Sequence, residues 1–374
     1  MNDVSSETLA RLTLLVAAQG DTRLVEQAIT KFGTAQLAAN APALRSRLKA
    51  GLTAHTSSVV DHEVHAARKV GARIINGIDQ PYPDALSSFD PVLLSIRGSW
   101  PSGPMVAIVG SRDADAYGLE IAATLGRVCA QSGVCVVSGA AHGIDAAALN
   151  ATLDAGGTAL AFLGFGIAHR AATVPSELLD RLLSAGTVIS EFLPTARGSK
   201  TSYLARNRLI AALADVTVVV QAKVKSGSLN TAKHAKRLGR PVFAIPGDVG
   251  VAVNEGSNHL ISSGQAQMLT HLGTLGRMLG RLELKRARWP ARCRSVDFTR
   301  KLVEHETSRL DLTAGERVLA AIERAGGPLD RIQLAAAIAS DLSVLDELLM
   351  ELELEGYVGR DPAGRYTARR TKKG

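Results

Sequence analysis

The sequence is poor in cysteine, with only Cys129, Cys135 and Cys293 among its 374 residues. These three form no Cys-x-x-Cys pair, and their spacing matches no common metal site. A sparse and odd set of cysteines is typical of a reducing compartment, and Cys129 and Cys135 lie in an apolar segment. We therefore expect buried free thiols and no metal centre.

Long apolar runs are also lacking. The longest candidate, residues 209–220, is interrupted by Asp215, and it falls short of the ~18 residues that a membrane-spanning helix needs. The N-terminus is polar, without a basic stretch followed by an apolar one, so no secretory signal is visible. We expect a cytoplasmic protein.

The composition is that of a globular chain, with 46% hydrophobic and 21% charged residues. Its length predicts two or three domains. Lys and Arg number 43 against 35 Asp and Glu, which gives a formal net charge of +8. A basic excess favours a polyanionic partner, although the location of the charge matters more than its sum.

Both ends of the chain differ in pattern from its middle. Apolar residues at helical spacing predict a small helical domain (SAM-like) over residues 1–71. Three helical stretches and a hairpin predict a winged helix over residues 312–374. The linker between, residues 273–311, is basic: its 276–301 segment holds nine Lys or Arg and two acids. It is either a solvated linker or an arm that tracks phosphates.

Residues 72–272 alternate between apolar strands and amphipathic helices. The strands are predicted at 72–76, 105–109, 134–137, 158–163, 187–189, 216–220 and 241–245. The helices are predicted at 117–131, 142–155, 176–185, 201–214 and 227–238. Continuous apolar strands separated by such helices predict an α/β fold, with a Rossmann-like, doubly wound parallel sheet.

Small and polar residues follow the predicted strands, where ligands bind in open parallel sheets. These residues are Ser111 with Arg112, Ser138 with Gly139, and Ser226 with Gly227 and Ser228. Glycine lets a backbone approach a ligand closely, and helix N-termini and hydroxyls offer hydrogen-bond donors to anions. One such loop is a weak signal, but several at one sheet edge predict a site for phosphates.

A second group of polar residues begins the helix predicted at 201–214. It comprises Lys200, Tyr203, Arg206, Asn207 and Arg208. The charged groups and the amide suit phosphate and base contacts, and the tyrosine ring suits base stacking. The alternative is an exposed helix start with salt bridges.

Dinucleotide and ATP fingerprints are absent from this arrangement. No Gly-x-Gly-x-x-Gly follows the first core strand, and no P-loop pattern occurs anywhere. We therefore expect neither NAD nor ATP, and no other cofactor.

The loops together resemble the DNA-processing protein A (DprA/Smf) family of bacterial transformation. The matching motifs, in order, are Gly110-Ser111-Arg112, Ser138-Gly139, Gly143-Ile144-Asp145, Ser190-Glu191, Arg206-Asn207-Arg208, Ser226-Gly227-Ser228-Leu229, Pro246-Gly247 and Gly256-Ser257-Asn258. The resemblance implies a Rossmann-like core that binds single-stranded DNA, dimerises and helps to load the RecA recombinase, without catalytic turnover. Because RecA is loaded on single strands, this role also implies single-strand-binding protein as a possible partner.

The sequence departs from the family pattern at several positions. It has His142 where an arginine is usual, Leu149 where a histidine is usual, and Gln221 where an acid is common. Val174-Pro175 replaces a Tyr-Pro pair, and Tyr203 is not followed by proline. These changes leave DNA binding as the expectation, while natural transformation, repair and phage defence stay open as cellular roles.

Two rival functions stay open. A nucleotide-processing enzyme of the phosphoribohydrolase type would need a placed carboxylate, for which only Asp145 and Glu191 are candidates. A winged-helix transcription factor would need a basic recognition helix, but residues 341–359 contain no Lys or Arg. We predict that the winged helix contacts proteins or is inert towards duplex DNA.

Overall fold

The computed structural model describes residues 4–41, 44, 48, 54–79, 82–87 and 92–271. In the C-terminal part it describes 318, 321–322, 325, 327–338, 345, 349, 352, 358–361 and 365–368. The chain divides into two compact units, Met1–Leu302 and Val303–Gly374. The predicted basic linker over 273–311 and Cys293 lie outside the described residues.

The described residues at the start of the chain form α1 (Ser6–Ala17), α2 (Thr22–Phe32), α3 (Ala35–Asn40) and α5 (Ala54–Lys69). The first three have side-chain N-caps, in which Ser5, Asp21 and Thr34 accept backbone N–H groups that the helix leaves unpaired. Their buried apolar residues belong to the same core as those of the sheet that follows. The described residues of this segment form helices, and the small helical (SAM-like) domain over residues 1–71 stays a prediction.

Polar contacts tie these helices to the rest of the unit. The Thr8 hydroxyl donates to Asp79 Oδ2 at 2.6 Å. Buried Glu63 on α5 accepts from both the backbone N–H and the hydroxyl of Thr195, at 2.9 and 2.7 Å. Partly buried hydrogen bonds as well as apolar contacts therefore join these helices to the rest of the unit.

A nine-stranded sheet forms the centre of the first unit. Its strands are β1 (Arg73–Ile75), β2 (Leu94–Arg97), β3 (Met105–Val109), β4 (Cys135–Ser138), β5 (Ala159–Leu163), β6 (Thr187–Ser190), β7 (Val216–Val219), β8 (Val242–Ala244) and β9 (Gln267–Met268). Their order is β1-β2-β6-β5-β4-β3-β7-β8-β9. The strands from β6 to β9 pair in parallel, whereas β2 pairs antiparallel with both β1 and β6. The predicted parallel sheet is confirmed for the core strands.

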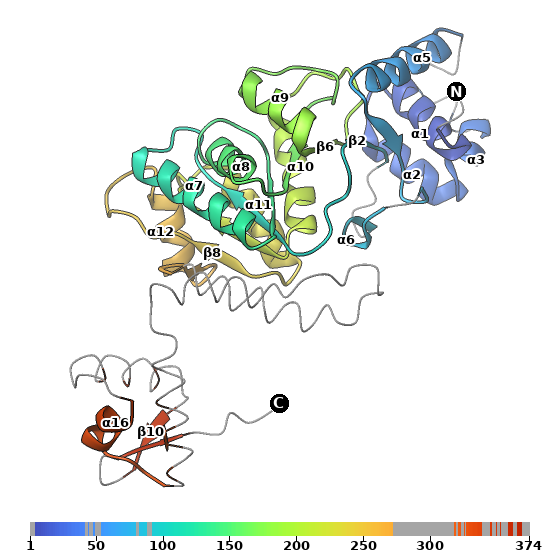
Figure 1. Ribbon diagram of the computed structural model, residues 1–374. Helices are drawn as coiled ribbons and strands as arrows, with labels where there is room; N and C mark the ends of the chain where they lie inside the picture. The colour runs from blue at the N-terminus through green and yellow to red at the C-terminus, as the bar shows by residue number, and fades with distance from the viewer. Residues whose placement is uncertain are drawn as a thin grey trace. The chain divides into compact units, whose positions relative to one another are not determined.

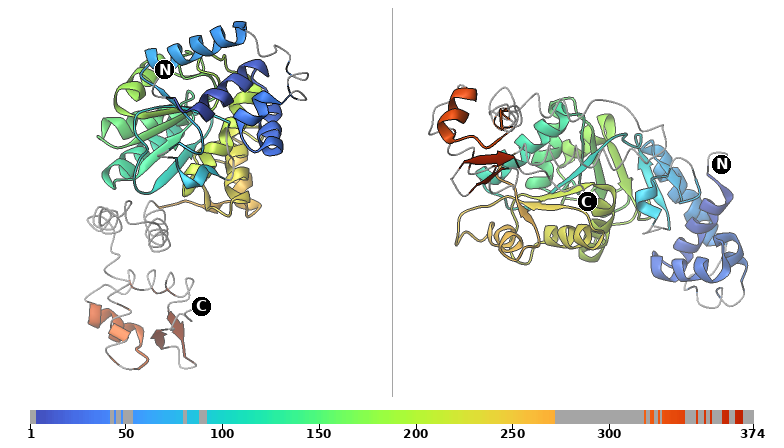
Figure 2. Two further views of the ribbon diagram at one scale, coloured as in Figure 1. Left: turned by 90° about the vertical axis from the view of Figure 1, so that its right-hand side faces the viewer. Right: turned by 90° about the horizontal axis from the view of Figure 1, so that it is seen from below.

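Helices cover both faces of this sheet (Figure 1). One face packs against α7 (Ala116–Gln131), α8 (Ile144–Asp154) and α9 (Ser176–Ala185). The other packs against α10 (Lys200–Leu213), α11 (Gly227–Arg237), α12 (Glu255–Ser262) and the short α6 (Asp84–Ser87). In the right-hand view of Figure 2 the sheet lies between the green helices and the yellow ones. The doubly wound arrangement follows from the strands, whose alternate residues are buried on opposite faces.

Four described elements of the unit were not among the predicted ones: β2, β9, α6 and α12. The helix predicted at 142–155 begins two residues later, because Gly143 precedes it as N-cap with φ of 77°. That left-handed conformation is open to glycine and ends the preceding loop.

The second unit contains α16 (Arg331–Ile338) and a hairpin of β10 (Val358–Arg360) and β11 (Tyr366–Ala368). A small apolar cluster that includes Val318, Leu334 and Tyr366 holds them together. The hairpin at this position was predicted. Most of the helices predicted at 313–325 and 342–356 lie outside the described residues, so the winged helix stays a prediction.

No helix in the described part of the chain is long and apolar enough to cross a membrane.

Candidate nucleic-acid interface

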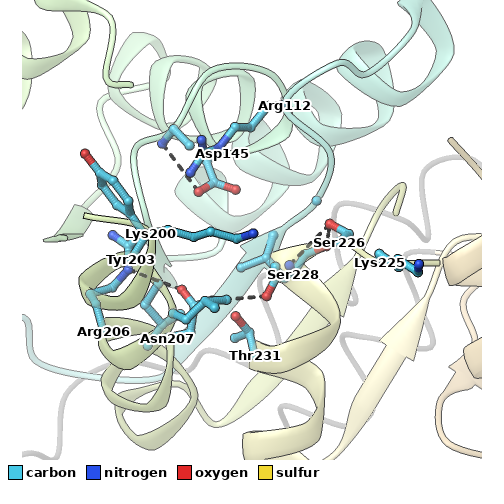
Figure 3. A pocket seen from close by; sticks show the side chains of 16 residues that line it. Arg112, Asp145, Lys200, Tyr203, Arg206, Asn207, Lys225, Ser226, Ser228 and Thr231 are labelled. Atoms are coloured by element: carbon cyan, nitrogen blue, oxygen red, sulfur yellow. Dashed lines mark hydrogen bonds between the residues drawn. The ribbon is translucent and has the colours of Figure 1, made fainter. Parts of the chain in front are cut away.

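The order of the core strands creates a crevice beside β3. From β3 the chain proceeds to β4, β5 and β6 on one side, and then returns to place β7 and β8 on the other. The loops after β3 and β7 therefore diverge, which is where ligands bind in open α/β sheets. A pocket of about 500 Å³ lies at this point. It is lined by the end of β3, the start of α8 and the first turns of α10 and α11 (Figure 3).

Most of the residues predicted for the site line this pocket. They are Arg112, Lys200, Tyr203, Arg206, Asn207, Ser226, Gly227 and Ser228. Ser111, Ser138, Gly139 and Arg208 do not line it. Lys225, Asp145 and Leu204 also line it, and none of these three was predicted for the DNA site.

Three cations surround the opening of the pocket. Arg112, Lys200 and Lys225 are exposed, and none of their side chains forms a hydrogen bond or ion pair with a residue that the structure describes. Lys200 points into the middle of the pocket in Figure 3. Lys225 directly precedes the Ser226-Gly227 pair. Because that loop was predicted to bind phosphates, the position of Lys225 in the sequence could have identified it as a further site residue. Unpaired cations around a concave site attract an anion.

In contrast to these exposed cations, the side chain of Arg206 is buried. The residue is 4% exposed, and its Nη1 donates to the carbonyl oxygens of Gly139, at 3.0 Å, and of Phe162. Burial lowers the pKa of Arg206 to about 10, and the charge of nearby Asp145 acts against this shift. Arg206 therefore stays charged at neutral pH and joins the carboxyl ends of β4 and β5 beneath the pocket. Its contact with DNA stays a prediction.

Asp145, at the start of α8, interacts electrostatically with this arginine. Its Oδ2 accepts the backbone N–H of Gly139 at 3.1 Å and that of Ala141 at 3.4 Å. Burial raises the pKa of Asp145, while the charge of Arg206 and the two N–H groups favour the carboxylate. The predicted phosphate donor at Gly139 is therefore already occupied by an internal carboxylate.

Two other predicted residues also have internal partners. The Ser138 hydroxyl is fully buried and donates to the Ile108 carbonyl at 2.6 Å. Arg208 forms a two-pronged ion pair with buried Glu191, with Nη1–Oε1 and Nη2–Oε2 distances of 2.9 and 2.7 Å. This pair holds α10 against the end of β6, which corresponds to the salt-bridge alternative stated for this helix start.

The start of α11 is open to the pocket. Ser226 is its N-cap and accepts the Ser228 N–H at 3.3 Å, and Asn207 Nδ2 donates to the Gly227 carbonyl at 3.0 Å. A methyl group added at Gly227 would meet only Leu204, at 3.7 Å. The backbone at this helix N-terminus, where the helix dipole is positive, therefore remains accessible to an anion.

Tyr203 is held in place on several sides. A methyl group at Gly164 or at Gly198 would come within 2.3 Å of its atoms, and its hydroxyl accepts from Thr173 at 3.0 Å. The guanidinium of Arg112 lies over the ring, 5.5 Å from its centroid. A base could join this platform only alongside the guanidinium or in its place.

The departure at Gln221 lies below the pocket and does not line it. The side chain is fully buried, and its Nε2 donates at 2.9 Å to both Asp115 Oδ1 and Asn254 Oδ1. It thus connects the N-cap of α7 with that of α12. His142 is another position that departs from the family pattern. Its ring is exposed, and its Nε2 contacts the Ala172 carbonyl oxygen at 3.0 Å. Neither Gln221 nor His142 lines the pocket.

Residues 73–279 match the model of the DNA recombination-mediator protein A family. The chain belongs to this family. The match includes all the core strands and every residue that lines the pocket, and it confirms the resemblance that the motifs indicated.

Individual relatives agree with this placement. A putative DNA processing protein DprA of Mycobacterium tuberculosis is 41% identical over 178 residues, which are 47% of this chain and 45% of that protein. The chain thus matches about half the length of this relative. The solved structure of DNA processing protein A from Streptococcus pneumoniae has a TM-score of 0.55 at 28% identity, covering 70% of this chain and 93% of that one.

A second solved structure concerns the single-stranded DNA binding mode of DNA processing protein A from Helicobacter pylori. Its TM-score is 0.50 at 26% identity, and the match covers 58% of this chain and 98% of that one.

Proposed function

We propose that the chain binds single-stranded DNA at the pocket beside β3 and acts as a recombination mediator. The observation that carries this proposal is that three exposed cations, Arg112, Lys200 and Lys225, line a concave site and form no ion pair with a residue that the structure describes. Family membership and the DNA-binding relative from Helicobacter pylori support the same ligand. A phosphodiester backbone is the polyanion that such a site suits.

The exposed and buried residues take different roles in this proposal. Arg112, Lys200 and Lys225 contact phosphates, and the open backbone at Gly227 receives a phosphate oxygen. Tyr203 and Leu204 offer flat and apolar surface to a base or sugar. Arg206 and Asp145 act as positioning residues, because both hydrogen-bond to the backbone of Gly139 and so hold the loops that carry the exposed residues.

The rival enzyme reading finds less support in the geometry. Of the two candidate carboxylates, Asp145 accepts two backbone N–H groups next to Arg206, and Glu191 is paired with Arg208. A general acid or base needs a carboxylate that can exchange a proton with a substrate. We therefore propose a binding protein without catalytic turnover.

The cellular role rests on the family. We propose that the protein is cytoplasmic, dimerises, and helps to load RecA onto strands coated with single-strand-binding protein during natural transformation. The test is whether the full chain accelerates RecA filament formation on such coated strands. Absence of acceleration at every protein ratio would reduce the proposal to DNA binding alone.

The DNA site is tested by binding of the full chain to labelled single-stranded and duplex DNA. Three phosphate contacts on a single strand give a slope of about −2 for the logarithm of the affinity against that of the salt concentration. The double variant Lys200→Gln/Lys225→Gln should flatten this slope by about 1.4 and lose less affinity than wild type when salt rises. Duplex should bind more weakly, because the crevice suits one backbone.

The matched control is Lys31→Gln/Lys69→Gln, which removes the same charge from exposed positions on α2 and α5. It should leave the slope unchanged. Equal flattening by both double variants, or tighter binding of duplex, would show that the pocket has been wrongly assigned.

A further inference from the structure

Helix α11 carries a second group of cations beyond the pocket. Lys233, Lys236 and Arg237 are exposed, and the helix sequence from Gly227 to Arg237 contains no acidic residue. In the described part of the chain, no hydrogen bond or ion pair engages the side chains of these three residues. They are therefore available to a ligand.

Helix stability alone does not account for this arrangement. Cations in the last turn benefit from the helix dipole, which explains Lys236 and Arg237 but not Lys233. Lys233 lies three and four residues before the other two, and like charges at these spacings destabilise a helix. The positive charge of this group also affects the pKa of His234, whose ring is half-buried. Its pKa is lowered, first by burial and then by Arg237, Arg208 and Lys233.

The cations continue a path that starts in the pocket. Ser228 and Thr231 on the first turns of α11 line the pocket, and the helix then runs away from it (Figure 3). At 1.5 Å per residue, Lys233 lies about 9 Å and Arg237 about 15 Å along the axis from Gly227. Steps of three and four residues place Lys233, Lys236 and Arg237 on one face of α11.

We propose that the face formed by Lys233, Lys236 and Arg237 is a second phosphate-binding surface, which the same DNA strand reaches after leaving the pocket. This inference rests on the proposed function of the pocket. Its ligand is the phosphodiester backbone of single-stranded DNA longer than the pocket can hold. The surface adds affinity and salt dependence without base preference, because its contacts go to phosphates only.

The test compares strands of about 5 and about 20 nucleotides, a range that brackets common single-strand site sizes. The full chain and its variant Lys233→Gln/Lys236→Gln/Arg237→Gln are titrated with each strand between 50 and 200 mM salt. On the long strand, loss of three phosphate contacts flattens the slope by about 2. Over this fourfold salt range, wild type then loses about 16-fold more affinity than the variant. On the short strand the two proteins bind alike.

The control variant is Arg23→Gln/Arg68→Gln/Lys69→Gln, which removes three exposed cations from α2 and α5. It should leave both slopes unchanged. An unchanged slope of the α11 variant on the long strand overturns the proposal. So does an equal effect of the control, or an equal effect of the α11 variant on both strands. Failure of wild type to bind either strand would refute the proposed function as well, which separates the two failures.

Discussion

Two arginines that the sequence assigns to one site should respond differently to substitution. Arg112 is exposed, and its guanidinium lies over the Tyr203 ring. Arg206 is buried against the carbonyls of Gly139 and Phe162 and next to Asp145. We expect Arg112→Ala to weaken DNA binding in a stable protein, and Arg206→Met to weaken the fold itself.

The magnitudes follow from these surroundings. Loss of a hydrogen bond to a charged group costs about 1.5–3 kcal/mol, so Arg112→Ala should lower strand affinity by about 10- to 150-fold. Its effect on the free energy of unfolding is limited to the cation–π contact, about 0.5–1 kcal/mol at an exposed site. Arg206→Met removes a charged donor from the buried carbonyls of Gly139 and Phe162, at about 1.5–3 kcal/mol for each hydrogen bond, and it removes the favourable charge beside buried Asp145.

The assay pairs urea unfolding, followed by circular dichroism, with anisotropy of a labelled single strand. Both variants are measured in the same buffer and at a temperature where both are folded. The expected result is that the free energy of unfolding of Arg206→Met falls well below that of wild type. A value within about 1 kcal/mol of wild type, together with DNA binding as weak as that of Arg112→Ala, would contradict this expectation. That result would make Arg206 a direct DNA ligand instead of a positioning residue.

Three further predictions concern the interior. Gly139→Ala should lower the free energy of unfolding by about 1–3 kcal/mol, because the added methyl would lie 2.5 Å from a buried guanidinium nitrogen. In the same urea titration Gly227→Ala should be tolerated, and equal losses would contradict the packing argument. Burial raises the pKa of Cys129 to about 12 and also raises that of Cys135. Both thiols should therefore resist iodoacetamide at pH 8 until the protein unfolds, and mass spectrometry of the alkylated peptides checks this. The thiols favour folding while protonated, so their contribution to stability should fall as pH rises above the ordinary thiol pKa. Gln221→Glu replaces an amide that donates to two oxygens by an acceptor. It should destabilise the protein more at pH 7 than at pH 4.5, where the new carboxyl is protonated, and an equal loss at both would argue against this account.

The core of the fold was predictable because its strands are buried on both faces. Such strands appear as continuous apolar runs, as in β3 (Met105–Val109), which matched its predicted bounds. The β2 strand escaped because Leu94–Arg97 is short, alternates apolar and polar residues, and lies in a proline-rich passage. Its antiparallel pairing with β6 joins segments about 90 residues apart, which no local pattern specifies.

The site was predictable as a set of loops, but the orientations of its side chains were not. Arg206 lies three and four residues before buried Leu209 and Ile210, so its helical position already placed it on the apolar face. Because arginine is charged, the residue was predicted to be an exposed DNA contact, and the helical spacing that indicates burial was overlooked. The pairing of Arg208 with Glu191 depends on how α10 docks against β6, which the sequence does not reveal.

The bond between Glu63 and Thr195 links the evolution of two distant segments. Thr195 lies in the loop that leads to Lys200 and Tyr203, and Glu63 belongs to a helix that does not line the pocket. A chain that exchanged its N-terminal helices for an unrelated module would leave the Thr195 amide and hydroxyl without their acceptor. Under the proposed function, a change at Glu63 on α5 would therefore also affect the loop that leads to the pocket, and we expect substitutions at residues 63 and 195 to occur as compensating pairs.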